Sequence, residues 1–148
     1  YYGLNVKLSY KNWDFGFNGH GSLGYMVFND FASNHSTSYF DVNAGNLPNF
    51  ATAVKRTGFT QISGDYQYFS DFYLENASFF RLDDINLGYT FRDIRNWNGN
   101  IRVAASCQNV FVLTNYSGID PEINSTDGVD RTFWPRPRTF SIRLNVNF

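Results

Sequence analysis

The sequence predicts an all-β protein, an antiparallel up-and-down β-barrel that crosses a membrane with its strands. Three observations lead to this fold class. Aromatic residues make up 20% of the 148 residues although the mean hydropathy is only −0.37, and Phe, Tyr, Asn, Ser and Gly take the place of the usual helix formers. Five segments alternate apolar and polar residues with a period of two, which is typical of strands. The connections between these segments are alternately short and long, as in membrane barrels.

The first two strands are expected over 3–10 and 13–28. In the first, the apolar residues Leu4, Val6, Leu8 and Tyr10 alternate with polar ones. In the second, aromatic and aliphatic residues share one parity and polar residues share the other. Four glycines interrupt this pattern without a helix after them, so they indicate strand bending or close packing and not a phosphate-binding loop. They are Gly16, Gly19, Gly21 and Gly24.

The third and fourth strands are expected over 78–91 and 100–113. In the third, the alternation changes phase between Leu82 and Ile85. A β-bulge near Asp83 and Asp84 explains this change, because one extra residue reverses the faces of all that follow. The same two carboxylates point to opposite faces of a regular strand, which argues against their use as an acid–base pair.

The fifth strand is expected over 138–148, where the pattern is cleanest. Apolar residues alternate strictly with Thr, Ser, Arg and Asn over ten positions, which is the length of a tilted membrane-spanning strand. The apolar set is Phe140, Ile142, Leu144, Val146 and Phe148.

The connections predict the orientation in the membrane. Lys11-Asn12 and the segment 92–99 are short and are expected to face the periplasm, whereas 29–77 and 114–137 are long and are expected to be extracellular loops. Aromatic residues flank the short connections, as expected for the girdle where a barrel leaves the bilayer. These residues are Tyr10, Trp13 and Trp97.

Five strands are too few to close a membrane barrel, because an open sheet edge leaves backbone groups without hydrogen-bond partners in lipid. We therefore expect the chain to be the last five strands of a larger barrel. Several copies completing one barrel would be the alternative.

Other classes of function have little support in the residues. The net charge of −1 does not suggest a nucleic-acid partner. The single Cys107 cannot form an internal disulfide, and two histidines, His20 and His35, do not suggest a metal site. We expect no enzyme activity, no metal and no cofactor, since no nucleophile and base stand in a recognisable arrangement.

Three stretches together resemble one family, the SusC/RagA-type TonB-linked (TonB-dependent) outer-membrane transporters. They are YLENASFFRLDDINLGYTF from Tyr73, VAASCQNVFVLTNYSGIDPE from Val103 and WPRPRTFSIRLNVNF from Trp134. The opening hairpin is similar as well, and the likeness is weakest over 29–71. Arg143 departs from the pattern, because the family often has a smaller residue there.

The resemblance implies the C-terminal part of a barrel of about 22 strands with a plugged lumen. It implies a multi-pass protein in the outer membrane of a gram-negative bacterium, with a plug outside these residues and energy supplied through TonB. The expected partners are a SusD-like surface lipoprotein, TonB through the N-terminal part of the receptor, the barrel-assembly machinery, outer-membrane lipids and a glycan or peptide substrate. The ending Leu144, Val146 and Phe148 resembles the signal that the barrel-assembly machinery reads.

The loop over 114–137 supplies the candidate contacts to a ligand or partner, since carbohydrate sites often combine aromatic rings with carboxylates. The candidates are Tyr116, Asp120, Glu122 and Trp134. A loop that simply folds through Asx turns is the plainer interpretation. The rival for the whole chain is a soluble β-sandwich binding module with carbohydrate-binding loops, which should place turn signals at both ends of its strands.

Overall fold

The computed structural model describes residues 1–35, 70–92, 99–123, 127–131 and 134–148, and the chain divides into two compact units. Unit 1 comprises Tyr1–Leu23, Ser78–Thr114 and Arg136–Phe148. Unit 2 comprises Gly24–Ala77 and Asn115–Pro135. Among the described residues, no helix is long and apolar enough to cross a membrane.

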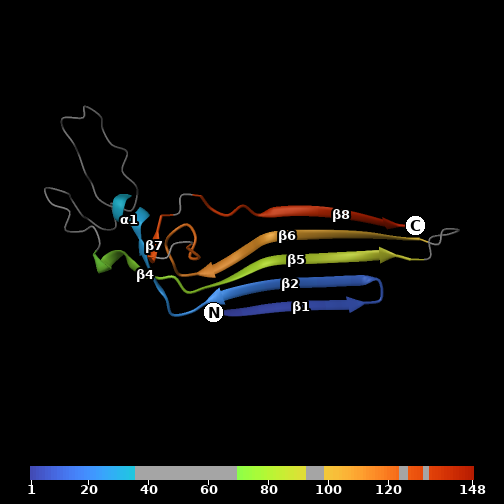
Figure 1. Cartoon of the computed structure of the whole chain (residues 1–148), viewed down its shortest axis with the longest axis horizontal. Coiled ribbons are helices and arrows are strands. Elements are labelled where there is room, and N and C mark those ends of the chain that lie inside the picture. The colour runs from blue at the N-terminus through green and yellow to red at the C-terminus, as the bar shows by residue number, and fades with distance from the viewer. Residues whose placement is uncertain (36–69, 93–98, 124–126, 132–133) are drawn as a thin grey trace, which may run out of the picture. The chain divides into compact units, whose positions relative to one another are not determined.

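Unit 1 is a five-stranded sheet in the order β1-β2-β5-β6-β8, and every neighbouring pair is antiparallel (Figure 1). Its strands are β1 (Tyr2–Tyr10), β2 (Trp13–Ser22), β5 (Phe79–Phe91), β6 (Asn100–Thr114) and β8 (Thr139–Asn147). The prediction of an all-β antiparallel fold is therefore confirmed. Among the described residues, this sheet of unit 1 is open, with β1 and β8 at its edges.

The hairpin between β1 and β2 turns at Lys11 and Asn12, as expected. Tyr10 pairs with Trp13, and Lys11 has a left-handed φ of 54°. The amide of Thr90 donates a hydrogen bond of 2.8 Å to the Asn12 carbonyl, which ties the turn to β5. The strand register places the connection 92–99 at the same end, because β5 finishes and β6 begins there.

The bulge predicted near Asp83 and Asp84 is confirmed. Successive residues Asn18 and Gly19 of β2 pair with Asp84 and Leu82, so Asp83 is the extra residue of β5, and the pairing of β5 with β6 shifts at the same place. Opposite it, Asn109 of β6 has a left-handed φ of 51°. The bulge returns Phe80 and Leu82 to the face that carries Ile85 and Leu87, which explains the change of phase in the sequence.

The strand predicted over 13–28 is wrong as one element. β2 ends at Ser22, and Gly24 with a φ of +75° breaks the extended backbone. The chain then forms β3 (Met26–Asn29), which belongs to a different sheet. The alternation concealed this break, because Leu23, Tyr25 and Val27 keep the parity of the apolar residues before them.

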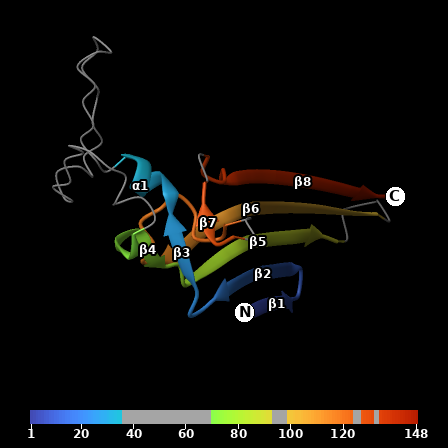
Figure 2. The same cartoon turned by 60° about the vertical axis from the view of Figure 1, so that its left-hand side comes forward.

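Unit 2 contains short elements where long loops were expected. They are β3, α1 (Asp30–His35), a 3-10 turn η1 (Asp71–Tyr73), β4 (Leu74–Asn76) and β7 (Val129–Asp130). Its sheet has the order β4-β3-β7, with β3 antiparallel to β4 and parallel to β7 (Figure 2). Val27, Ala77 and Tyr116 form a small core, against which Tyr25 and Ile123 pack.

Candidate functional site: a sheet with one apolar and one polar face

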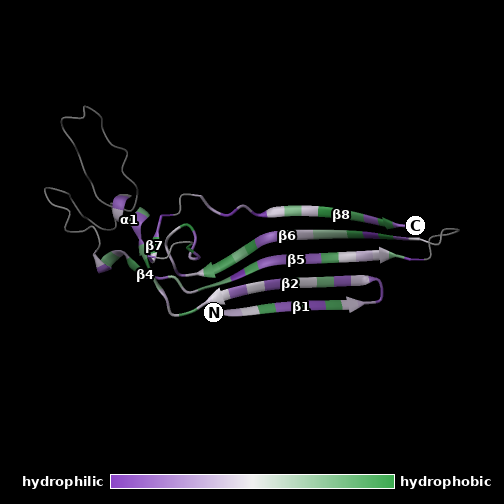
Figure 3. Ribbon diagram, in the orientation of Figure 1, coloured by the Kyte–Doolittle hydropathy of each residue, from purple (hydrophilic) through white to green (hydrophobic). Residues whose placement is uncertain are grey.

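The strand register of unit 1 gathers the apolar residues of all five strands on one face. One row across the sheet, for example, contains Leu8, Phe15, Leu87, Ala105 and Ile142. Figure 3 shows the alternation of hydrophobic and hydrophilic residues along each strand. Large side chains on this face are open to the surroundings, with Phe140 75% and Ile142 85% exposed. A continuous exposed face of this kind requires apolar surroundings, such as lipid or a protein partner.

Aromatic residues gather on this face next to the short connections. The rings of Trp13 and Tyr89 meet edge to face with centroids 4.7 Å apart, and Tyr89 contacts Phe91 at the same distance. Tyr10 pairs with Trp13 across the hairpin, and the Lys11 ammonium lies 5.3 Å from the Tyr10 ring. The girdle of Tyr10, Trp13 and Trp97 remains a prediction, and Trp97 lies outside the described residues. Sequence reasoning missed Tyr89 and Phe91, which only the pairing of β2 with β5 brings to this cluster.

The opposite face is polar, and one ion pair on it spans three strands. The Asp14 carboxylate on β2 accepts hydrogen bonds from Arg102 on β6, with Nε–Oδ1 at 2.9 Å and Nη2–Oδ2 at 2.5 Å. The guanidinium passes over Gly88 of the intervening β5. A Cβ at Gly88 would collide with both partners, so this glycine provides the space for the ion pair. The sequence places the two charges on the same face but does not show that they meet.

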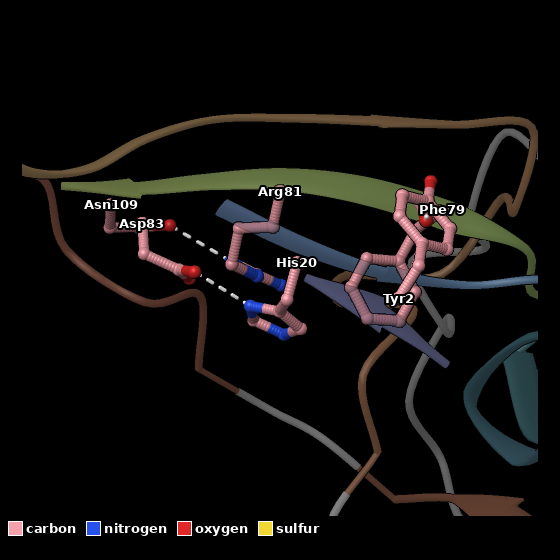
Figure 4. A network of polar contacts seen from close by, with 6 residues as sticks. All are labelled: Tyr2, His20, Phe79, Arg81, Asp83 and Asn109. Atoms are coloured by element: carbon pink, nitrogen blue, oxygen red, sulfur yellow. Dashed lines mark hydrogen bonds and ion pairs between the residues drawn. The ribbon is translucent and has the colours of Figure 1, made fainter. Parts of the chain in front are cut away.

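A second cluster of polar side chains in unit 1 lies at the bulge (Figure 4). His20 Nδ1 and Asp83 Oδ2 are 2.7 Å apart. Arg81 donates to the Asn109 side-chain oxygen at 2.8 Å, and the Asn109 amide nitrogen donates to the Arg136 carbonyl at 2.7 Å. The left-handed Asn109 therefore ties β5 to the segment that leads into β8. These contacts hold the register of the strands.

The adjacent carboxylates Asp83 and Asp84 have different partners. Asp83 contacts His20, whereas Asp84 accepts a hydrogen bond of 3.2 Å from Asn86 two residues along β5. Among the described residues, no group of three or more His, Cys, Asp or Glu side chains is arranged to hold a metal ion.

A hollow of about 230 Å³ opens on unit 1 around Gly16. The side chains with the parity of the polar face that line it come from β1, β2 and β5 and include both charges and amides. They are Asn5, Lys7, Ser9, Asp14, Asn18, Asp84 and Asn86. Such a lining suits water or a hydroxyl-rich or amide-bearing group more than an apolar one.

In unit 2, two of the four candidate loop residues are buried and form hydrogen bonds within the unit. Tyr116 is 6% exposed and donates a hydrogen bond of 2.7 Å to Asp130. Burial, together with the neighbouring Asp130 carboxylate, raises the pKa of the Tyr116 hydroxyl above its usual range. Asp120 is also buried and accepts a hydrogen bond of 2.9 Å from the Glu122 amide, which forms an Asx turn.

The same unit is held by a polar cluster around Asn29. The Asn29 amide donates to Glu75 at 3.0 Å and to Ser117 at 3.1 Å, and the Ser117 hydroxyl and amide both donate to Glu75. Gly118 has to be small, because a Cβ there would collide with the Tyr116 ring. Sequence reasoning missed Asn29 and Glu75, since nothing local in the sequence shows that the two long connections fold together.

Of the other predicted site residues, Glu122 is half-buried in the turn that its amide forms with Asp120, and the rest lie in two places. Trp134, 84% exposed, is a loop residue of unit 2 that is available for contact. Leu144, Val146 and Phe148 are all exposed in or directly after the edge strand β8, which pairs with β6 on one side only. The proposed roles of these residues in partner contact and barrel assembly remain predictions.

Comparisons with known proteins agree with this two-faced sheet. Protein-family models give no match. The chain is 39% identical over 99% of its length to the TonB-dependent receptor SusC of Bacteroides thetaiotaomicron, and 29% identical over 99% to the TonB-dependent receptor P3 of Formosa agariphila. It spans only 15% and 16%, respectively, of these two relatives.

Solved structures show the same fold. A structure of the RagAB peptide transporter matches 96% of this chain and 16% of its own, with a TM-score of 0.69 and 19% identity. The RagAB peptide importer in its open-open state matches 99% of this chain and 17% of its own, with a TM-score of 0.66 and 18% identity. The fold and the two faces are those of a segment of an antiparallel β-barrel wall. The curated relatives narrow the class, and the chain belongs to the TonB-dependent receptors of the SusC/RagA type.

Proposed function

We propose that this chain is part of the barrel wall of an outer-membrane importer that takes up nutrients such as oligosaccharides or peptides. The observation that carries the proposal is the five-stranded antiparallel sheet with one exposed apolar face and one polar face. The apolar face would contact lipid, and the polar face would line the lumen. Similarity to TonB-dependent receptors over nearly the whole chain supports the same function.

The wall is a passive element of this importer, and its residues carry out no catalytic step. Transport energy would reach the receptor through TonB, and a SusD-like surface lipoprotein would help to capture the substrate. Both long connections start and finish at one end of the sheet. There β2 ends and β5 begins, and there β6 ends and β8 begins. This arrangement agrees with a barrel whose long loops are extracellular.

A transport experiment on the intact receptor tests this function. A strain that lacks the receptor should lose growth on particular oligosaccharides or peptides offered as the limiting nutrient, and the intact gene should restore it. A matched receptor without its TonB-contacting segment should reach the outer membrane but fail to restore growth. Unchanged uptake of every offered nutrient in the deleted strain would contradict the proposal.

The partner is tested separately through Trp134. Trp134→Ala should reduce co-purification of a SusD-like lipoprotein or retention of the substrate several-fold, because an exposed Trp is a frequent anchor of interfaces. Tyr10→Phe, at an exposed aromatic residue of the β1–β2 hairpin, is the control and should leave both unchanged. Equal results for the two variants would remove Trp134 from the contact surface.

A further inference from the structure

The apolar face of unit 1 contains a hollow in addition to its exposed side chains. Its volume is about 260 Å³, and it lies where β6 carries the small residues Ala105 and Cys107. The neighbouring strands carry larger side chains at the same level, Leu87 and Ile142 beside Ala105, and Ile85 and Phe140 beside Cys107. The apolar side chains that line the hollow are Phe15, Ile85, Leu87, Ala105, Cys107 and Phe140.

The shape of the hollow follows from this pattern of side-chain size. Ala105 and Cys107 follow one another on this face of β6. Because β5 and β8 carry larger side chains beside them, a groove remains along β6. A void beside apolar side chains costs contact energy unless an apolar group fills it. The lining side chains offer a long apolar group dispersion contacts on several sides, and they offer little to a polar ligand.

The position of the hollow along the bilayer normal indicates which part of a lipid would occupy it. The aromatic cluster of Trp13 and Tyr89 lies in the row immediately before the row of Phe15, Leu87 and Ala105. Two residues along a strand correspond to about 7 Å. Aromatic belts lie at the headgroup level, and the apolar half of a bilayer is about 15 Å thick. The hollow therefore lies within the leaflet next to the short connections, which face the periplasm in outer-membrane barrels.

We propose that this hollow binds one acyl chain of a phospholipid from the periplasmic leaflet, with the ester region of the lipid at the level of Tyr10, Trp13 and Tyr89. The proposal rests on the proposed function, because the apolar face must lie against lipid. It goes further in assigning a discrete site to a lipid that would otherwise exchange freely along the wall. The hydroxyl of Tyr89 and the indole N–H of Trp13 can donate hydrogen bonds to the ester oxygens.

Photolabelling of the intact receptor tests the site. The receptor is reconstituted in vesicles of phosphatidylethanolamine and phosphatidylglycerol with a small amount of phosphatidylethanolamine that carries a diazirine in its acyl chain. After irradiation, labelled peptides are located by mass spectrometry. Residues of β6 around Ala105 should be labelled several-fold more than residues of β1 around Leu8, although both lie in the same row and at the same depth.

Two matched variants separate a site from ordinary lipid contact. Ala105→Phe fills the hollow and should reduce labelling of β6 to the level of β1. Leu8→Phe adds a ring in the same row on β1, three strands away from β6, and should leave labelling of β6 unchanged. Heat-modifiable migration in gels shows which variants fold, and Cys107→Phe replaces Ala105→Phe if that variant fails to fold.

The remaining outcomes overturn the proposal in distinguishable ways. Equal labelling of β1 and β6 in the unchanged receptor, or labelling that Ala105→Phe leaves intact, would show ordinary lipid contact without a site. Cross-linking of the hollow to another polypeptide would assign the face to a protein partner. Labelling absent from the whole apolar face would overturn the membrane-wall function together with the lipid site.

Discussion

The two units of the chain place their apolar side chains differently. In unit 1, large apolar residues such as Ile142 and Phe140 lie on an exposed face, while charged residues such as Asp14 and Arg102 pair on the other face. In unit 2, a core of Val27, Ala77 and Tyr116 is buried together with polar residues such as Asn29 and Asp130.

This contrast separates two sources of stability. Unit 1 depends on its surroundings, because an exposed apolar face and two open edges need lipid and further strands. Unit 2 depends on internal contacts, since its few apolar residues are supplemented by buried hydrogen bonds that are costly to leave unmade. Substitutions should therefore act through the membrane in unit 1 and through the loss of a hydrogen-bond partner in unit 2.

The largest expected effect is that of a charge on the apolar face. Ile85→Arg should destabilise the intact receptor by about 2–4 kcal/mol, because Ile85 lies two rows beyond the Trp13–Tyr89 row and this is the cost of a basic residue on the lipid face of a barrel near the midplane. Ser106→Arg, on the polar face of the neighbouring strand, is the control and should cost much less. Denaturant unfolding of the receptor in vesicles measures both. Equal losses would show that the two faces are wrongly assigned.

Loss of one buried hydrogen bond should have the next largest effect, and it should be confined to unit 2. Tyr116→Phe removes the donor to Asp130 and should cost about 1–3 kcal/mol. Hydrogen exchange measured by peptide should become faster within 115–130 and 70–77, whereas peptides of β1 and β8 should be unchanged. Acceleration throughout the chain would mean that the two units do not respond separately.

The ion pair over Gly88 should contribute less, because both partners are partly exposed. Gly88→Ala should displace the Arg102 guanidinium from Asp14 and cost about 1 kcal/mol or less. In the background of Asp14→Ala, which removes both the charge and the side-chain atoms that the new Cβ would meet, the same substitution should have almost no further effect. Unfolding free energies of the four proteins form a double-mutant cycle. Additive losses would show that Gly88 acts independently of the ion pair.

The smallest effect near neutral pH is the titration of Tyr116. Its folded pKa is raised, and an unfolded Tyr has a pKa of about 10. The contribution of Tyr116 to stability is therefore fully present below pH of about 10 and is lost as the pH rises further, because only the unfolded chain releases the proton. Above pH of about 10, the rate of amide hydrogen exchange in unit 2 should rise more steeply with pH in the unchanged receptor than in Tyr116→Phe. Parallel pH profiles would contradict this.

Much of unit 1 could be predicted from the sequence. Alternation of Phe140, Ile142, Leu144 and Val146 defines β8 and its two faces, because side chains of a strand point to opposite sides at every step. The change of phase at Asp83 predicts the bulge for the same reason. Two-residue and short connections predict antiparallel neighbours.

Unit 2 was far less predictable. Leu23, Tyr25 and Val27 continue the alternation of β2, so the sequence gives no warning that Gly24 ends the strand and that β3 joins another sheet. Tyr116 and Asp120 have the composition of a ligand site, but burial places them in structural hydrogen bonds. The residue type shows which contacts a side chain is able to make. Whether that side chain is buried depends on segments that are distant in the sequence.

By itself, the sequence determined the strands of unit 1, their apolar and polar faces, the tight hairpin and the bulge, since these depend on neighbours within a few residues. Only the tertiary structure decided which residues meet across the sheet and within unit 2. The Asp14–Arg102 pair over Gly88, the Asn109 contacts, the Asn29–Glu75–Ser117 cluster and the hollow beside Ala105 all depend on the pairing of distant segments. Such pairing is set by hydrogen bonding and packing between segments, which no local pattern records.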